Sequence, residues 1–234
     1  MAGETYPEDS IQSLVHEWWT RDESGTVARG RLLKAFVPFT ENKPLALIPE
    51  GRPAATDHTR AIVRVVPFHM DRPARGGVLP VAAMPLHPGE AYYAVRGKVR
   101  PAVVLSEGGN EVPAALRRGQ ASWQTARTFL VAPYYGGEAD GERAGWNPAF
   151  VERIRRAEYP QYVWDRLPTA ASESILRLDN ILPIGADPAA YKLADYRMTD
   201  EALELLDEWL AWLFSGGLPE GGVLAGIRSD LAAL

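Results

Sequence analysis

The chain has 234 residues, of which 46% are apolar, and it carries a formal charge of −5 at pH 7. A chain of this size can bury one sizeable hydrophobic core or two smaller ones. The absence of cysteine excludes disulfides, thiolate metal sites and a cysteine nucleophile, and the acidic balance argues against a surface that attracts nucleic acid everywhere.

The first expected element is a helix over residues 8–20. Its apolar side chains recur at i, i+3, i+4, i+7 and i+8, the spacing of one helix face: Ile11, Leu14, Val15, Trp18 and Trp19. Asp9 or Ser10 is available as the N-cap. We expect the two tryptophans of this stripe to pack on the main body of the protein.

The pattern then becomes extended. Short strands are predicted at residues 32–39, 45–48 and 61–68, separated by the turn-forming sequences Asn-Lys-Pro and Glu-Gly-Arg-Pro. A stretch rich in Pro, Gly and Arg follows at residues 71–77. We take it as the boundary between an N-terminal helix and β extension, 1–77, and a main domain, 78–234.

The main domain begins with strands, predicted over residues 78–84, 92–95 and 102–105. The sequence Val-Arg-Gly-Lys at 95–98 is expected to form the hairpin turn between the last two. A polar interval, 107–126, leads to a further strand over 129–133. That strand ends in Tyr134-Tyr135-Gly136-Gly137, where two aromatic rings beside a glycine pair are candidates for a binding surface.

An insertion of residues 138–171 separates this strand from the next one, which alternates over 173–184 and then turns. Within the insertion, Asn147-Pro148 starts a helix with an apolar face formed by Phe150, Val151 and Ile154. A C-terminal helix begins after the N-cap Thr199 and ends at Gly216-Gly217. It is apolar on more than one face, so we expect it to pack between two surfaces, either in a dimer or within the chain.

The order of several sequence motifs resembles that of the PemK/MazF toxin family. These motifs are Gly89-Glu90, then Arg100-Pro-Ala-Val-Val-Leu-Ser106, then Val131-Ala-Pro133, and then Ser174 with Leu178-Asp179-Asn180-Ile181. The resemblance implies an α+β fold for the main domain: a small SH3-like β-barrel of the PemK/MazF type. The N-terminal helix and extra strands, the inserted helical segment and the C-terminal helix would elaborate it.

Members of this family cleave RNA without a metal ion, so the resemblance implies an endoribonuclease toxin that acts on single-stranded RNA. Arg100 matches the catalytic arginine, whose guanidinium faces the phosphorane formed when the ribose 2′-hydroxyl attacks its own phosphate. Tyr135 stands where the family has a threonine or serine; a phenol can donate a proton, but its length displaces the reacting phosphate. From the residues alone, a structural arginine paired with Glu90 or Asp179 is an equally good interpretation of Arg100.

The expected partners are RNA and a small antitoxin protein. Arg96, Lys98 and Tyr134 are expected to hold the RNA by charge and stacking. Residues 96–127 carry six basic residues against two acidic ones, a positive balance within an acidic protein. An uneven stretch of solvated charge is the alternative interpretation.

A non-catalytic barrel that serves as a binding or protein-interaction module is the alternative function. The acidic net charge and the replacement at Tyr135 favour it, whereas the retained Arg100-Pro101 element favours the nuclease. We expect no cofactor, because the sequence has no phosphate-binding glycine loop and no nucleophile elbow. We also expect no metal, because the histidines have no metal-ligand spacing: His16, His58, His69 and His87.

The composition predicts a cytoplasmic bacterial protein. No apolar run approaches the roughly 20 residues of a membrane span, and the acidic first residues are unlike a signal peptide. The absence of cysteine fits a reducing compartment. Arginine outnumbers lysine 21 to 4, which is typical of a GC-rich bacterial genome.

Overall fold

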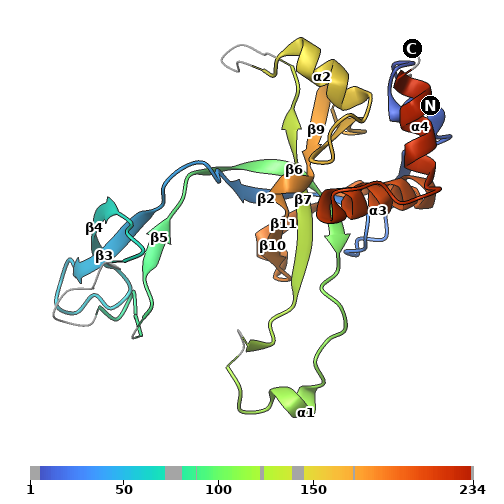
Figure 1. Ribbon diagram of the computed structural model, residues 1–234. Helices are drawn as coiled ribbons and strands as arrows, with labels where there is room; N and C mark the ends of the chain where they lie inside the picture. The colour runs from blue at the N-terminus through green and yellow to red at the C-terminus, as the bar shows by residue number, and fades with distance from the viewer. Residues whose placement is uncertain are drawn as a thin grey trace. The chain divides into compact units, whose positions relative to one another are not determined.

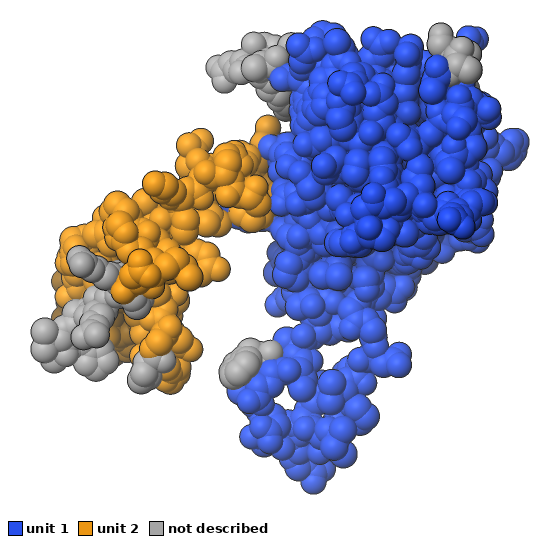
Figure 2. All heavy atoms as spheres, in the orientation of Figure 1, with its two compact units in different colours: residues 1–36, 99–234 blue, residues 37–98 orange. Residues whose placement is uncertain are grey.

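The computed structural model describes residues 6–71, 81–87, 89–121, 124–138, 145–170 and 172–232. These residues form a mixed α+β structure whose strands build an eight-stranded and a three-stranded sheet (Figure 1). The chain divides into two compact units: unit 1 holds residues 1–36 and 99–234, and unit 2 holds residues 37–98 (Figure 2). None of the helices in the described residues has the length and apolar character needed to span a membrane.

The larger sheet is antiparallel and curled. Its strands follow the order β1-β11-β2-β6-β7-β9-β8, and β10 pairs with β7. The strands are β1 (Trp19–Arg21), β2 (Arg31–Pro38), β6 (Gly97–Ser106), β7 (Thr128–Gly136), β8 (Tyr162–Arg166), β9 (Glu173–Arg177), β10 (Leu182–Gly185) and β11 (Tyr191–Met198). Register shifts occur between Val104 and Ser106 in β6 and between Leu193 and Arg197 in β11. Such bulges increase the local twist and help the sheet to curl.

Side chains of the larger sheet are buried on both faces. Along β6, Val103 and Leu105 belong to one hydrophobic cluster, whereas Ala102 and Val104 belong to another. This follows from the alternation of side chains along a strand. The first cluster also takes in residues of η1 (Ile11–Leu14), α3 (Asp200–Ser215) and α4 (Val223–Ala232), and the buried members of the second all come from strands. The predicted buried strand at 102–105 is confirmed.

The two long helices predicted in the C-terminal half are confirmed, with the caps that the sequence indicates. At the start of α3, the Thr199 hydroxyl accepts a hydrogen bond from the amide of Ala202 at 3.2 Å, and Gly216 ends the helix with a φ of 80°. Asn147 caps α2 (Pro148–Arg155) in the same way. α4 is a further helix, of 10 residues. In the described part of the chain, α1 (Ala114–Arg117), η3 (Leu178–Asn180) and η4 (Pro188–Ala190) are short segments of one turn each.

The predicted helix over residues 8–20 is wrong. Only η1 is helical, as one 3₁₀ turn, and Trp19 begins strand β1, which pairs with β11. Trp18 and Trp19 are 1% and 7% exposed, so both pack on the body of unit 1 as expected. The backbone hydrogen bonds to β11 and the burial of both indoles outweigh helical propensity, which is weak in so short a segment.

Unit 2 contains the three-stranded antiparallel sheet. In it, β3 (Leu45–Gly51) lies between β4 (Ile62–Pro67) and β5 (Tyr92–Ala94). These strands confirm the predictions at 45–48, 61–68 and 92–95, and β2 confirms the one at 32–39. The strand predicted at 78–84 is wrong for residues 81–84, which form a turn; residues 78–80 lie outside the described part of the chain.

The hairpin turn expected at residues 95–98 is also wrong. β5 pairs with β3, whereas β6 begins at Gly97 and joins the larger sheet. Two strands that follow each other closely in sequence therefore belong to different sheets. The boundary expected at 71–77 falls mostly on residues outside the described part, and the compact units divide the chain at other positions.

Candidate functional site

Arg100 and Tyr135 lie against each other on neighbouring strands. β6 and β7 are antiparallel, and their register pairs Ala102 with Pro133. If this register is continued by two residues on each strand, Arg100 lies opposite Tyr135. The guanidinium carbon of Arg100 lies 3.9 Å from the centre of the Tyr135 ring, a close cation–π contact. Both side chains are partly exposed. The fold thus brings together the two residues expected to be catalytic, and their catalytic role stays a prediction.

Tyr134 and Tyr135 point to opposite faces of the sheet, as neighbours on a strand must. Tyr134 is 2% exposed and belongs to the main hydrophobic cluster of unit 1. Its hydroxyl donates a hydrogen bond of 2.9 Å to Asp165. This burial corrects the expectation that both rings are presented to RNA, because only Tyr135 reaches the surface.

Arg177 is a second cation beside Tyr135. It lies across from Tyr162 in the pairing of β8 and β9. Its guanidinium carbon is 5.4 Å from the centre of the Tyr135 ring and 5.5 Å from that of Tyr162. Asp179 holds this guanidinium with two hydrogen bonds, of 2.6 and 2.7 Å, which raise the pKa of Arg177 above its ordinary value. Asp179 is therefore a partner of Arg177.

Asn180 fixes the phenol of Tyr135. Its side-chain amide donates a hydrogen bond of 2.8 Å to the Tyr135 hydroxyl, and Asn180 itself is 8% exposed. Because the phenol oxygen already accepts this bond, the group that it can offer to a ligand is its own proton. We call Arg100, Tyr135, Tyr162, Arg177 and Asn180 the arginine–tyrosine cluster.

Three members of this cluster were not predicted from the sequence: Tyr162, Arg177 and Asn180. Arg177 and Asn180 lie in the stretch 173–184, which was recognised as a strand followed by a turn. The alternation of that strand could have placed Arg177 on the same face as Ile175, which opposes Tyr135 in the sheet. No comparable sequence pattern indicated the position of Tyr162, because strand β8, to which it belongs, was not predicted.

Further aromatic side chains continue the cluster towards α2. The ring of Tyr162 lies 5.5 Å from Trp146, 5.6 Å from Phe150 and 6.3 Å from Tyr159, measured between ring centres. The guanidinium of Arg153 stands 5.0 Å from the centre of the Tyr159 ring. All four rings are partly exposed. Partly exposed rings interleaved with arginines are suited to stacking on the bases of a single strand.

Arg96 and Lys98, the other residues expected to bind RNA, belong to unit 2. The guanidinium of Arg96 lies 5.9 Å from the centre of the Phe39 ring in the same unit, and Lys98 is exposed. The arginine–tyrosine cluster is formed by unit 1 alone. The expected role of Arg96 and Lys98 stays a prediction.

A buried carboxyl group lies on the opposite face of the sheet. Asp165 is 0% exposed and accepts hydrogen bonds from the Tyr134 hydroxyl and, at 3.1 Å, from the indole nitrogen of Trp19. Burial raises the pKa of Asp165 to about 8. With this pKa the carboxyl group of Asp165 is mainly protonated at neutral pH, and we expect the stability of the core to depend on pH.

Comparison with protein-family models, with curated proteins and with solved structures finds no match. The fold and the chemistry of the cluster are therefore the grounds on which a function can be assigned.

Proposed function

We propose that the chain is a divergent PemK/MazF-like protein with an SH3-like barrel of that type, and that it binds single-stranded RNA at the arginine–tyrosine cluster and cleaves it without a metal ion. The observation that carries this proposal is the 3.9 Å approach of Arg100 to the Tyr135 ring. Arg100 begins the Arg-Pro-Ala-Val-Val-Leu-Ser segment, and Tyr135 follows the Val-Ala-Pro segment by two residues; both segments are motifs of the resemblance.

Binding follows from the shape and charge of the cluster. Bases stack on the partly exposed rings of Tyr135 and Tyr162, which contributes about 1–3 kcal/mol for each stacked base. When the flat face of a guanidinium stacks on an aromatic ring, the N–H donors lie along the edge of the guanidinium. There they can bind two phosphate oxygens at once. The cluster therefore suits a flexible single strand better than a duplex, whose bases are already stacked.

Cleavage requires three groups. The ribose 2′-oxygen forms a bond to phosphorus while the bond from phosphorus to the 5′-oxygen breaks, which leaves a 2′,3′-cyclic phosphate and a 5′-hydroxyl. Arg100 stabilises the charge of the phosphorane. The Tyr135 hydroxyl, oriented by Asn180, protonates the departing 5′-oxygen, and the Asp179 carboxylate accepts the proton of the 2′-hydroxyl.

The test is incubation of the purified chain with a long single-stranded RNA in the presence of a chelator. We expect fragments that end in 2′,3′-cyclic phosphate, and no fragments with Arg100→Ala. Arg117→Ala is the matched control, because Arg117 is an exposed arginine that pairs with Glu111 at 2.8 Å, away from the cluster. A parent protein that leaves the RNA intact at equimolar concentration would end the cleavage proposal. As a toxin, the active chain should also arrest growth on expression.

A non-catalytic RNA-binding module is the second candidate. The observation that favours it is the contact of the Tyr135 ring with the guanidinium of Arg100. The family has a short hydroxyl side chain at the position of Tyr135, which would leave the face of this guanidinium uncovered. This candidate predicts RNA binding that weakens in Arg100→Ala without any cleavage. Fluorescence anisotropy with a labelled RNA, run beside the cleavage assay, separates the two candidates.

A further inference from the structure

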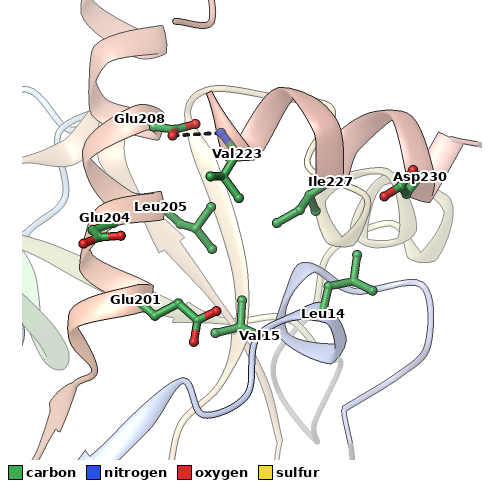
Figure 3. A pocket seen from close by; sticks show the side chains of 9 residues that line it. All are labelled: Leu14, Val15, Glu201, Glu204, Leu205, Glu208, Val223, Ile227 and Asp230. Carbon is green, nitrogen blue, oxygen red and sulfur yellow. Dashed lines mark hydrogen bonds between the residues drawn. The ribbon is translucent and has the colours of Figure 1, made fainter. Parts of the chain in front are cut away.

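An acidic groove lies between η1, α3 and α4 in unit 1, with a volume of about 440 Å³ (Figure 3). Apolar residues form its floor, and carboxylates line the rest: Leu14, Val15, Leu205, Val223 and Ile227, with Glu201, Glu204, Glu208 and Asp230. We use the name acidic groove for these nine residues.

The floor of the acidic groove is accessible. Leu14 is 49% exposed and Val223 is 62% exposed. In Figure 3 the side chains of Leu14, Leu205, Val223 and Ile227 point towards one shared space, from three different elements. Converging apolar side chains in a concave site gain free energy when another apolar group covers them.

Negative charge surrounds this floor. Glu201, Glu204 and Glu208 recur at helical spacing over two turns of α3, about 10 Å along the helix axis, and Asp230 comes from α4. Within the described ranges, no lysine or arginine forms an ion pair with any of these four carboxylates. Glu208 accepts hydrogen bonds from the amides of Val223 and Leu224, at 3.0 and 2.8 Å, so it fixes the start of α4. The other three carboxylates remain available to a ligand.

We propose that the acidic groove binds a basic amphipathic helix of a partner protein. Aliphatic side chains of that helix insert between α3 and α4, and its lysines or arginines meet Glu201, Glu204 and Asp230. A row of carboxylates about two helical turns long matches cations repeated along a helix better than one small cation. RNA is repelled by the same charges, and so is the acidic groove of a second copy. This proposal does not depend on the proposed function of the arginine–tyrosine cluster.

The experiment uses the full chain and a labelled synthetic helix of about 15 residues, with leucines at i, i+3, i+4 and i+7 and lysines beside them. Fluorescence anisotropy should show saturable binding that weakens as salt is added. Combined Glu201→Gln, Glu204→Gln and Asp230→Asn substitutions should weaken binding about tenfold, as expected for the loss of three exposed charge pairs. Leu14→Ser should weaken binding several-fold without changing the salt dependence.

The matched control is the variant with Glu23→Gln, Glu41→Gln and Glu111→Gln, which loses the same number of negative charges at exposed positions outside the acidic groove. It should bind the peptide as the parent does, and a peptide with glutamates in place of lysines should not bind. Circular dichroism and thermal unfolding verify that the variants are folded.

Equal affinity of the groove variant and the control variant would overturn the proposal. So would self-association of the chain in sedimentation that the groove substitutions abolish, because the occupant would then be a second copy. Competition by single-stranded RNA for the groove would contradict it as well.

Discussion

The hydroxyl of Tyr134 donates a hydrogen bond of 2.9 Å to the carboxyl group of Asp165 in the core of unit 1. Tyr134 lies on β7, and the next residue of that strand belongs to the arginine–tyrosine cluster on the other face of the sheet. One strand therefore supports the core with one tyrosine and the candidate site with the next. A change in the charge of Asp165 acts directly on this strand.

Stability should decrease as the pH rises from about 4 to about 8. The folded-state pKa of Asp165, about 8, lies above the ordinary aspartate value of roughly 3.9, so the folded protein binds an extra proton in this window. The expected slope from this group reaches about 1.4 kcal/mol of unfolding free energy per pH unit. Urea unfolding at a series of pH values measures it.

Asp165→Asn should flatten that slope, because the amide does not titrate. Asp207→Asn is the control, since Asp207 is an exposed partner of Arg29 and should leave the slope as it is. A slope that persists unchanged in Asp165→Asn would show that another group causes the pH dependence.

Gly108→Ala should be far more destabilising than Gly109→Ala. Both glycines have a left-handed backbone, with φ of 77° and 76°, so both substitutions carry the same backbone strain, about 1 kcal/mol. A Cβ on Gly108 would lie only 1.9 Å from the carbonyl oxygen of Thr128, at the start of β7, whereas a Cβ on Gly109 meets nothing within 4 Å.

We expect an additional loss of at least about 2 kcal/mol for Gly108→Ala in urea unfolding. The clash falls between the end of β6 and the start of β7, so it should weaken the pairing of these two strands. Equal stabilities of the two variants would mean that the Gly108 loop adapts without cost.

Tyr135→Phe should separate binding from proton donation. The ring that contacts Arg100 remains, so the affinity for single-stranded RNA should stay within about twofold of the parent. The hydroxyl is lost, so the cleavage rate should decrease on the order of a hundredfold. Tyr135→Ala removes the ring as well and should weaken both. A cleavage rate that Tyr135→Phe leaves intact would exclude this phenol as the proton donor.

Glu208→Gln should loosen α4. The glutamate accepts amide hydrogen bonds of 3.0 and 2.8 Å from the first turn of that helix, and an uncharged amide replaces them only in part. We expect a loss of about 1 kcal/mol in unfolding free energy and faster amide hydrogen exchange in residues 223–232. Glu204→Gln, on the same helix, is the control and should leave the exchange of α4 unchanged.

The sequence by itself determined the elements whose ends are set locally. Thr199 and Gly216 mark the limits of α3, and Asn147 with Pro148 marks the start of α2, because a cap satisfies backbone groups only two to four residues away. The buried strand at 102–105 was recognisable for a similar reason, since its run of apolar side chains needs no knowledge of its partners. The neighbourhood of Arg100 was singled out from its motif.

The tertiary structure decided which strands pair and which faces they bury. Residues 19–21 became a strand because β11, far along the chain, supplies their hydrogen bonds, and residues 95–98 link two sheets because β5 finds its partner in β3. Alternation predicts that Tyr134 and Tyr135 point in opposite directions, but only the packed sheet determines which ring is buried. The contact of Tyr135 with Arg100 and the buried Asp165 arise from such pairings. These contacts depend on hydrogen bonds and burial between segments that are distant in the sequence. Their stabilising free energy therefore cannot be predicted from any single local segment.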